Sequence, residues 1–112
     1  MSFRTEIVGS AVEMLVLNLL TQRAMYGYQI IQTVNERTGG EFDWKEGTLY
    51  PVLHRLESAG YLASEWQVGD DSGKDRKYYK PTAKGLKHAA ARAEEWKKFS
   101  KSVNAALVRA EA

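Results

Sequence analysis

The stretch DWKEGTLYPVLHRLESAGYLASEW, residues 43–66, decides the fold of this chain. Its apolar residues recur at the spacing of one face of an α-helix, at Leu49, Val52, Leu53 and Leu56. Gly60 is expected to end this helix with a left-handed cap. An extended run follows directly, from residue 61 to residue 68. The stretch therefore predicts a short amphipathic helix that leads straight into a β-strand.

The opposite face of this helix is polar and aromatic, and it has no acid before Glu57. A helix with such a front, followed by a hairpin, fits a DNA major groove. An ordinary helix with a solvated polar face explains the same pattern, so this stretch alone leaves the function open. The residues on this face are Thr48, Tyr50, Pro51, His54 and Arg55.

Pro51 indicates where the helix begins, because proline lacks an N–H and is harmless only in the first helical turn. We expect a start near Gly47 or Thr48, with Thr48 as the N-cap. Asp43 and Glu46 also have capping-box spacing, but a start there would place Pro51 in the helix interior.

The composition indicates one small domain without disulfides. The chain has 112 residues and no cysteine. Its longest strongly apolar run, residues 14–20, is far shorter than the roughly 20 residues that span a bilayer. The N-terminus lacks a signal-peptide pattern. We therefore expect a cytoplasmic protein without a membrane segment.

The net charge of +2 conceals an asymmetry along the chain. Residues 1–73 hold five Lys/Arg and ten Asp/Glu, whereas residues 74–101 hold ten Lys/Arg and three Asp/Glu. A basic segment on an acidic protein suggests a polyanionic partner. A solvated basic helix explains the charges after Lys84 equally well.

Two further helices are expected before residue 43. Ser10 and Glu13 have capping-box spacing and predict a helix from Ser10 to about Gln22. This helix is apolar most of the way round, so it needs either a second subunit or burial at the centre of its own domain. A turn precedes the next helix, which runs from Tyr26 or Gly27 to Arg37 and ends at Gly39 and Gly40.

Tyr26 and Tyr28 stand at the start of that second helix. Buried, hydrogen-bonded tyrosines are one explanation. Contact with phosphate is the more specific explanation, because helix N-termini and tyrosine hydroxyls often bind phosphate.

After the central helix, alternating residues predict a β-hairpin. The run 61–68 alternates with strand periodicity, GDDSG (residues 69–73) is a turn cluster, and KDRKYYK (residues 74–80) forms the returning strand that Pro81 ends. Three helices and a hairpin with a basic tip make a winged helix-turn-helix. Asp70, Asp71 and Asp75 favour a purely structural hairpin, because they repel phosphate. The basic residues near the tip are Lys74, Arg76 and Lys77.

Thr82 is expected to cap a last helix that reaches about Val108. Apolar residues along it follow a 3-4 spacing that resembles a coiled-coil seam. Pairing with a second copy is the expected use, and packing back on its own domain is the alternative. Trp96 in this seam is either an interface anchor or an aromatic floor for a flat ligand.

The sequence offers no catalytic or metal-binding motif. His54 and His88 lie on different helices, without cysteine or repeated carboxylate spacing. No glycine-rich phosphate loop or nucleophile motif is present. We expect a protein that is not an enzyme and that holds no cofactor or metal.

The chain resembles PadR-type transcriptional regulators of the short subclass, which have a single C-terminal helix. The resemblance rests on YGYQI (residues 26–30), EGTLYPVLHRLESAGYL (residues 46–62), Trp66 and DRKYYKPTAKG (residues 75–85), and with MLVLNLL (residues 14–20) it covers nearly the whole chain. Ala24-Met25 departs from it, where a Gly-Pro pair is common before YGY.

The resemblance implies a mainly α fold with a small β-hairpin, in which residues 1–81 form a winged helix-turn-helix and residues 82–112 a dimerisation helix, in one compact unit. It implies a homodimeric repressor that binds an inverted-repeat operator in double-stranded DNA. The recognition helix would be residues 47–58. The residues expected at DNA are Tyr26, Tyr28, Thr48, Tyr50, Pro51, His54, Arg55, Lys74, Arg76 and Lys77.

The resemblance also implies that the terminal helix pairs with the terminal and first helices of a partner. The expected dimer interface is Val12, Leu15, Val16, Leu86, Ala89, Ala93, Trp96, Phe99, Val103 and Leu107. Some relatives sandwich flat aromatic molecules between two tryptophans, and Trp96 matches that position, so a small planar aromatic effector is a further expectation. Two other classes remain as alternatives: a winged-helix module for protein–protein contact, and a small-molecule-binding protein without an operator.

Overall fold

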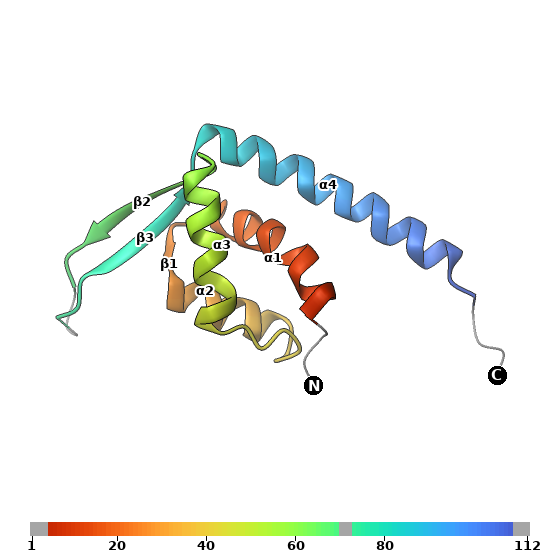
Figure 1. The fold of residues 1–112 in the computed structure, drawn as a ribbon, viewed down its shortest axis with the longest axis horizontal. Coiled ribbons are helices and arrows are strands. Elements are labelled where there is room, and N and C mark those ends of the chain that lie inside the picture. The colour runs from red at the N-terminus through yellow and green to blue at the C-terminus, as the bar shows by residue number, and fades with distance from the viewer. Residues whose placement is uncertain (1–4, 70–72, 109–112) are drawn as a thin grey trace.

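The computed structural model describes residues 5–69 and 73–108, with the backbone alone for residues 5–10. The described part is mainly helical with one small sheet, which confirms the expected fold class (Figure 1). Its elements in chain order are α1 (Thr5–Leu20), β1 (Met25–Tyr26), α2 (Gly27–Arg37), α3 (Glu46–Ser58), β2 (Leu62–Gln67), β3 (Arg76–Pro81) and α4 (Ala83–Ala106).

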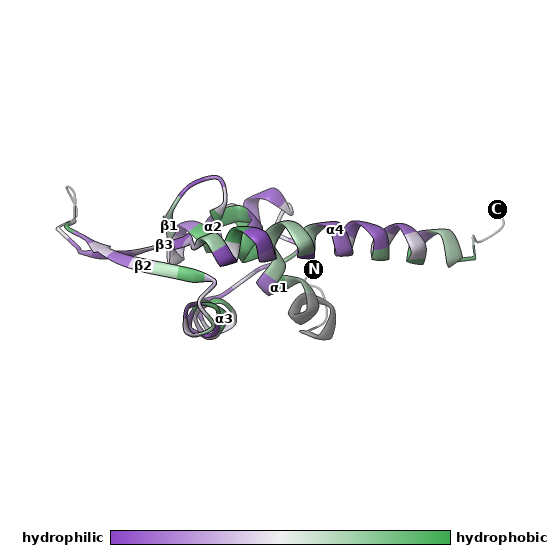
Figure 2. Ribbon diagram, turned by 90° about the horizontal axis from the view of Figure 1, so that it is seen from above, coloured by the Kyte–Doolittle hydropathy of each residue, from purple (hydrophilic) through white to green (hydrophobic). Residues whose placement is uncertain are grey.

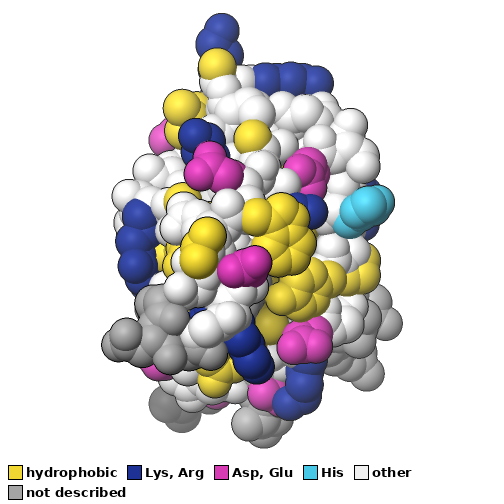
Figure 3. Space-filling model, turned by 90° about the vertical axis from the view of Figure 1, so that its left-hand side faces the viewer, with side chains coloured by type: hydrophobic (Ala, Val, Ile, Leu, Met, Phe, Trp, Pro, Cys, Tyr) yellow, Lys and Arg dark blue, Asp and Glu magenta, His cyan; other side chains and the backbone are white. Residues whose placement is uncertain are grey.

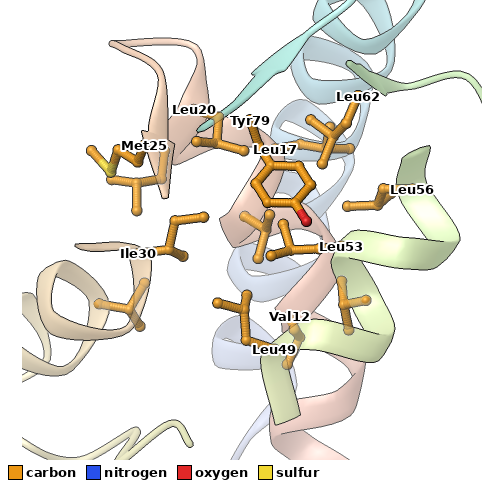
Figure 4. Packing of buried hydrophobic residues seen from close by; sticks show 14 of the residues in the cluster. Val12, Leu17, Leu20, Met25, Ile30, Leu49, Leu53, Leu56, Leu62 and Tyr79 are labelled. Carbon is orange, nitrogen blue, oxygen red and sulfur yellow. The ribbon is translucent and has the colours of Figure 1, made fainter. Parts of the chain in front are cut away.

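The core forms where α1, α2, α3 and the sheet meet. The apolar stripe of α3 is buried, and its leucines point toward α1 and toward Tyr79 of β3 (Figure 4). Each side chain of this size contributes about 1.5–3 kcal/mol on burial. The helical spacing read from the sequence therefore identifies the face of α3 that holds the domain together. The fully buried side chains are Val16, Leu17, Leu20, Met25, Ile30, Leu49, Leu53 and Leu56.

The first helix begins earlier than expected. It already includes Thr5, so Ser10 lies inside it and the prediction of a capping box at Ser10 is wrong. Glu13 makes an ion pair with Arg55 of α3 instead. Leu17 and Leu20 are buried within the single chain, as the alternative of a buried central helix predicts.

The start of α3 also differs from the expectation. Lys45 is the N-cap, because its carbonyl accepts the N–H groups of Thr48 and Leu49 at 3.0 and 3.1 Å. The prediction of Thr48 as N-cap is therefore wrong, and Pro51 stands in the second turn. A proline there leaves the Gly47 carbonyl without its usual N–H donor. Leu49 and Leu53 of the same helix are nevertheless fully buried in the core.

The end of α3 is closed by a double hydrogen bond. Gly60 has a φ of 84°, and its N–H donates to the Glu57 carbonyl at 3.0 Å. The Tyr61 N–H donates to the Leu56 carbonyl at 2.9 Å. This is the Schellman arrangement, so the expected glycine cap is confirmed.

The sheet has three strands in the order β1-β3-β2, all antiparallel. The hairpin pairs Leu62 with Pro81 and Gln67 with Arg76, so β3 begins two residues later than expected and Pro81 is its last residue. Strand β1 was not predicted, because two residues carry no periodicity of their own. It forms because Met25 and Tyr26 pair with Tyr79 and Tyr78.

The last helix starts as expected and stands partly clear of the rest. The Thr82 hydroxyl accepts the Gly85 N–H at 3.0 Å, which confirms the predicted cap. The helix ends at Ala106, two residues before the expected end. It contacts α1 near its start, and its second half projects away from the domain (Figure 1). Hydrophilic and hydrophobic segments alternate along it out to that free end (Figure 2). Its 24 residues make it about 36 Å long.

None of the helices in the part of the chain that the structure describes is long and apolar enough to cross a membrane.

Candidate nucleic-acid interface

A groove runs between the start of α2, the outer face of α3 and the hairpin of β2 and β3, which we call the wing. Its hollow measures about 280 Å³. Five of the ten residues that the sequence assigned to DNA line this groove together. Trp66, which the sequence analysis did not assign to DNA, lines it as well and is 67% exposed. The lining residues are Tyr26, Gly27, Tyr28, Tyr50, Trp66, Asp75, Arg76, Lys77 and Tyr79.

Tyr26 joins the sheet to the start of α2. Its backbone N–H donates to Gln29 Oε1 at 3.2 Å, and its ring meets that of Tyr78 edge-on with centroids 5.4 Å apart. The Arg76 guanidinium lies over the Tyr26 ring, 4.3 Å from its centroid. This cation–π contact holds Arg76 beside the groove while its N–H donors remain suited to phosphate.

Tyr28 is exposed on the first turn of α2, where Gln32 Nε2 donates to its hydroxyl at 3.3 Å. Because the side chain is largely solvated, its hydroxyl can reach an anion without unfolding any packing. The explanation of Tyr28 as a buried tyrosine is therefore wrong, whereas Tyr26 is half-buried.

Tyr50 reaches from α3 across to the N-terminus of α2. Its hydroxyl sits against Gly27, where any Cβ would collide with it. Burial raises the pKa of the Tyr50 phenol, and the nearby Glu46 and Tyr79 raise it further. The phenol therefore keeps its proton and remains a hydrogen-bond donor at neutral pH.

The outer face of α3 presents the remaining candidates. Pro51, His54 and Arg55 are exposed, and Thr48 is half-buried. Arg55 Nη2 lies 3.5 Å from Glu13 Oε2, with the two side chains 59% and 38% exposed. Ion pairs this exposed contribute little stability, so an incoming phosphate or base can replace Glu13.

The wing brings its cations to different places. Lys77 Nζ lies 3.7 Å from Glu57 Oε1, whereas Arg76 lies on Tyr26. Lys74 comes before β3, toward the tip. Asp75 Oδ1 accepts the Gly69 N–H at 3.2 Å, so this acid closes the wing. Asp70 and Asp71, the other acids of the predicted turn, lie outside the described residues.

Seen from the wing end, the described residues do not form one continuous basic patch. Hydrophobic side chains gather at the centre of this face, with Lys/Arg and Asp/Glu side chains mixed around them (Figure 3). The charges on this face are therefore suited to defined pairings more than to uniform attraction of a polyanion.

The residues expected at a dimer interface divide into two sets. Val12, Val16 and Ala89 are buried within the single chain, so the expectation that they offer contact surface to a partner is wrong for this structure. They pack on the core that α1 and α4 share. Leu15 and Ala93 are half-buried. The exposed members are Leu86, Trp96, Phe99 and Val103 on α4, and Leu107 at its C-cap.

A second hollow of about 330 Å³ lies beside this exposed stripe. Trp96 and Phe99 line it with ring centroids 5.9 Å apart and planes inclined by 36°. Met14 of α1 and the charged side chains of Arg92 and Glu95 complete it. It is a mainly aromatic surface with one cation and one anion at its margin.

Among the described residues, no group of three or more His, Cys, Asp or Glu side chains is placed to hold a metal ion.

The comparisons with known proteins agree with this geometry. The family model described as "Transcriptional regulator PadR-like family" matches residues 16–91. A protein of Lysinibacillus sphaericus, named only as uncharacterized, is 34% identical over 93 residues, which are 83% of this chain and 84% of that protein. Transcriptional regulator Rv3488 of Mycobacterium tuberculosis is 36% identical over 80 residues, 71% of this chain and 70% of that protein.

Solved structures are similar over most of the chain. A transcriptional regulator from Clostridium thermocellum superposes with a TM-score of 0.82 at 30% identity, covering 95% of this chain and 99% of that one. A PadR family transcriptional regulator from Eggerthella lenta superposes with a TM-score of 0.74 at 35% identity, covering 88% and 83%.

The contact between Gly27 and Tyr50 gives a first prediction. In Gly27→Ala the new methyl group displaces the Tyr50 ring into solvent, which removes the burial that raises its pKa. In an ultraviolet absorbance titration, we expect the pKa of the tyrosine that titrates at the highest pH to return toward the ordinary tyrosine pKa near 10. In the parent protein, folding stability should begin to fall as the pH rises above that value, because only the unfolded chain loses this proton readily.

Tyr50→Phe identifies which step of the titration belongs to Tyr50. Gly47→Ala is the matched control, since no atom outside its own helix lies within 4 Å of a Cβ placed there. An unchanged tyrosine titration in Gly27→Ala would show that the contact does not set the environment of Tyr50.

Proposed function

Because the chain belongs to the PadR-like family of transcriptional regulators, and is therefore a DNA-binding regulator, we propose that it acts as a homodimeric repressor on an inverted-repeat operator. The observation that carries this proposal is the groove, which gathers Tyr26, Tyr28 and Arg76 beside Tyr50 of α3. Membership also confirms that the chain is not an enzyme. Because a regulator of this family works on DNA, we propose the cytoplasm as its location.

We propose that α3 enters the major groove with its exposed face, while tyrosines at the start of α2 and the wing bind phosphates. Arg55 would exchange its exposed pair with Glu13 for a guanine edge or a phosphate. Arg76 would hold a phosphate from its place on Tyr26. The proposed contacts are Tyr26, Tyr28, Thr48, Tyr50, Pro51, His54, Arg55, Lys74 and Arg76. Lys77, the remaining candidate from the sequence, pairs with Glu57.

Operator binding is tested by fluorescence anisotropy of labelled DNA from upstream of the gene, against a scrambled duplex of equal length. We expect a preference of about 10³-fold or more that survives at physiological salt. Arg76→Ala should weaken binding to both duplexes and lower the slope of log affinity against log salt by about one. Lys101→Ala, at the far end of α4, should leave both quantities unchanged.

Equal binding to both duplexes that vanishes as salt rises would mean charge attraction alone. That result would favour the alternative of a winged-helix module for protein–protein contact. An unchanged salt slope in Arg76→Ala would remove the wing contact from the proposal.

We propose that the exposed stripe of α4 is covered by a second copy of the chain. Phe99 is 59% and Leu107 65% exposed, and a single helix this long cannot be covered by its own small domain. In Val103→Glu a charge enters the stripe between Phe99 and Leu107, so sedimentation should shift from a particle of twice the 12.6 kDa chain mass to the monomer. Ala91→Glu adds the same charge on the opposite face of α4 and should remain dimeric. A dimer that persists in Val103→Glu would place the interface elsewhere.

We further propose that a planar aromatic molecule binds against Trp96 and releases the DNA. The aromatic hollow of Trp96 and Phe99, with Arg92 and Glu95 at its margin, supports this role. A ligand that binds one arrangement of the two subunits better than another shifts the protein toward that arrangement.

Titration with planar aromatic dyes should quench tryptophan fluorescence and weaken operator binding over the same concentration range. Trp96→Ala should abolish both effects, whereas Trp66→Phe should leave the weakening of operator binding in place. Quenching that survives in Trp96→Ala would contradict the proposed site.

A further inference from the structure

Glu57 contacts both strands of the wing from the last turn of α3. Its Oε2 accepts a hydrogen bond from Ser64 Oγ of β2, and its Oε1 lies 3.7 Å from Lys77 Nζ of β3. The two oxygens of one carboxylate therefore join three elements. We call these two contacts the Glu57 clasp.

The strand register brings the two partners of the clasp together. Ser64 pairs with Tyr79 and Trp66 pairs with Lys77, so Ser64 and Lys77 are diagonal neighbours across the hairpin. Alternation along each strand puts them on the same face as Tyr79, whose side chain is buried against the core. The clasp thus continues, toward the tip, the attachment that Tyr79 begins.

Little else in the described part of the wing is anchored by burial. Leu62 and Tyr79 are its buried residues, and exposure rises from there to 90% at Val68. Figure 1 shows the hairpin extending away from the helices beyond this point. A polar contact at Ser64 and Lys77 therefore lies where the apolar attachment ends.

The position of Glu57 is otherwise unfavourable. A carboxylate in the last turn of a helix faces the negative end of the helix dipole. It also adds negative charge beside a face that binds DNA. The pairing with Lys77 offsets both effects locally, because the Lys77 ammonium lies 3.7 Å from the Glu57 carboxylate.

We propose that Glu57 is a positioning residue that fixes the angle of the wing against α3, and that Lys77 acts through Glu57 instead of binding phosphate. This inference rests on the proposed DNA face and divides its wing cations into two kinds. Arg76, on the Tyr26 ring, is the cation that meets DNA. Lys77 holds the wing in place, so that Arg76 contacts a phosphate while α3 lies in the major groove.

Loss of the clasp has two consequences. The wing is no longer fixed, so DNA contacts that the wing and α3 must make at the same time weaken. Lys77 is also released, and a free lysine binds any phosphate. Affinity for a scrambled duplex should therefore rise while preference for the operator falls.

Glu57→Gln is the main variant, because an amide accepts from Ser64 but cannot pair with the Lys77 charge. Glu65→Gln is the matched control. It removes one negative charge, as Glu57→Gln does, but from the face of β2 opposite to Ser64. We expect the ratio of operator to scrambled affinity to fall about 3- to 10-fold in Glu57→Gln, about 0.7–1.4 kcal/mol. In Glu65→Gln the ratio should stay within twofold of the parent protein.

The salt dependence separates the two roles of the wing cations. In the parent protein, Lys77→Ala should leave the salt slope unchanged, whereas Arg76→Ala lowers it by about one. In the Glu57→Gln background, Lys77→Ala should lower the slope by about one, because the released lysine has become a phosphate contact. A full unit lost from Lys77→Ala in the parent protein would overturn the assignment.

A measurement without DNA tests the clasp independently of operator binding. Trp66 is the cross-strand neighbour of Lys77, so its indole N–H signal in an NMR spectrum reports the position of the wing. The signal is assigned with Trp66→Phe. It should shift in Glu57→Gln and in Ser64→Ala, and remain in place in Glu65→Gln.

An identical Trp66 signal in Glu57→Gln and Glu65→Gln would overturn the clasp even if the operator is bound tightly. Conversely, a chain without operator preference would fail the proposed function while the Trp66 signal still decides the clasp. Thermal unfolding of each variant confirms that it is folded before either comparison is made.

Discussion

The turn at residues 59–61 is the constraint on which the rest of the structure depends. It closes α3, and both the wing and α4 are attached to it. The Thr82 hydroxyl donates to the Gly60 carbonyl at 2.6 Å, and the Thr82 N–H donates to the Tyr61 carbonyl at 3.1 Å. Lys84 Nζ donates to the Ala59 carbonyl at 3.0 Å. The carbonyls of residues 59–61, which directly follow α3, are thereby each bonded by Thr82 or Lys84 at the start of α4.

The start of α4 packs on the same turn. The His88 ring stacks on Tyr61 with centroids 4.1 Å apart. Gly85 passes so close to the Tyr61 carbonyl that any side chain there would collide with it.

The local parts of this arrangement could be predicted from the sequence, because each depends on neighbours in the chain. The glycine cap at Gly60 and the hydroxyl cap at Thr82 need only a few residues each, and both were predicted correctly. The capping box at Ser10 failed because the same short pattern is compatible with a helix interior, and nothing local distinguishes the two. Strand β1 could not be predicted, since two residues become a strand only when β3 lies beside them.

The candidate site was predictable by residue type and not by pairing. The sequence brought out Tyr26, Arg55 and Lys77 as suited to DNA, but it gave no sign of their partners within the chain. Arg55 meets Glu13, which lies 42 positions away, and Lys77 meets an acid on another element. Such contacts follow from how α1, α3 and the wing pack, so no periodicity encodes them. For the same reason Val12 and Val16, which fit a surface stripe, lie in the core.

The attachment at residues 59–61 also limits how this regulator can respond to events along α4. The bonds from Thr82 and Lys84 leave no free linker between the two helices, so α4 cannot change its angle to α3 without breaking them or moving the Tyr61 backbone. Because α4 is about 36 Å long, a small rotation at its start becomes a large displacement at its free end, and the reverse also holds. Coupling between distant sites requires an element with two arrangements that both sites influence. Within a single chain, the hydrogen-bonded turn holds α3 and α4 in one arrangement, so it cannot be the element that switches. In the homodimer proposed above, the second variable is then how the two α4 helices lie against each other, so that each α3 moves with its own α4 as one body.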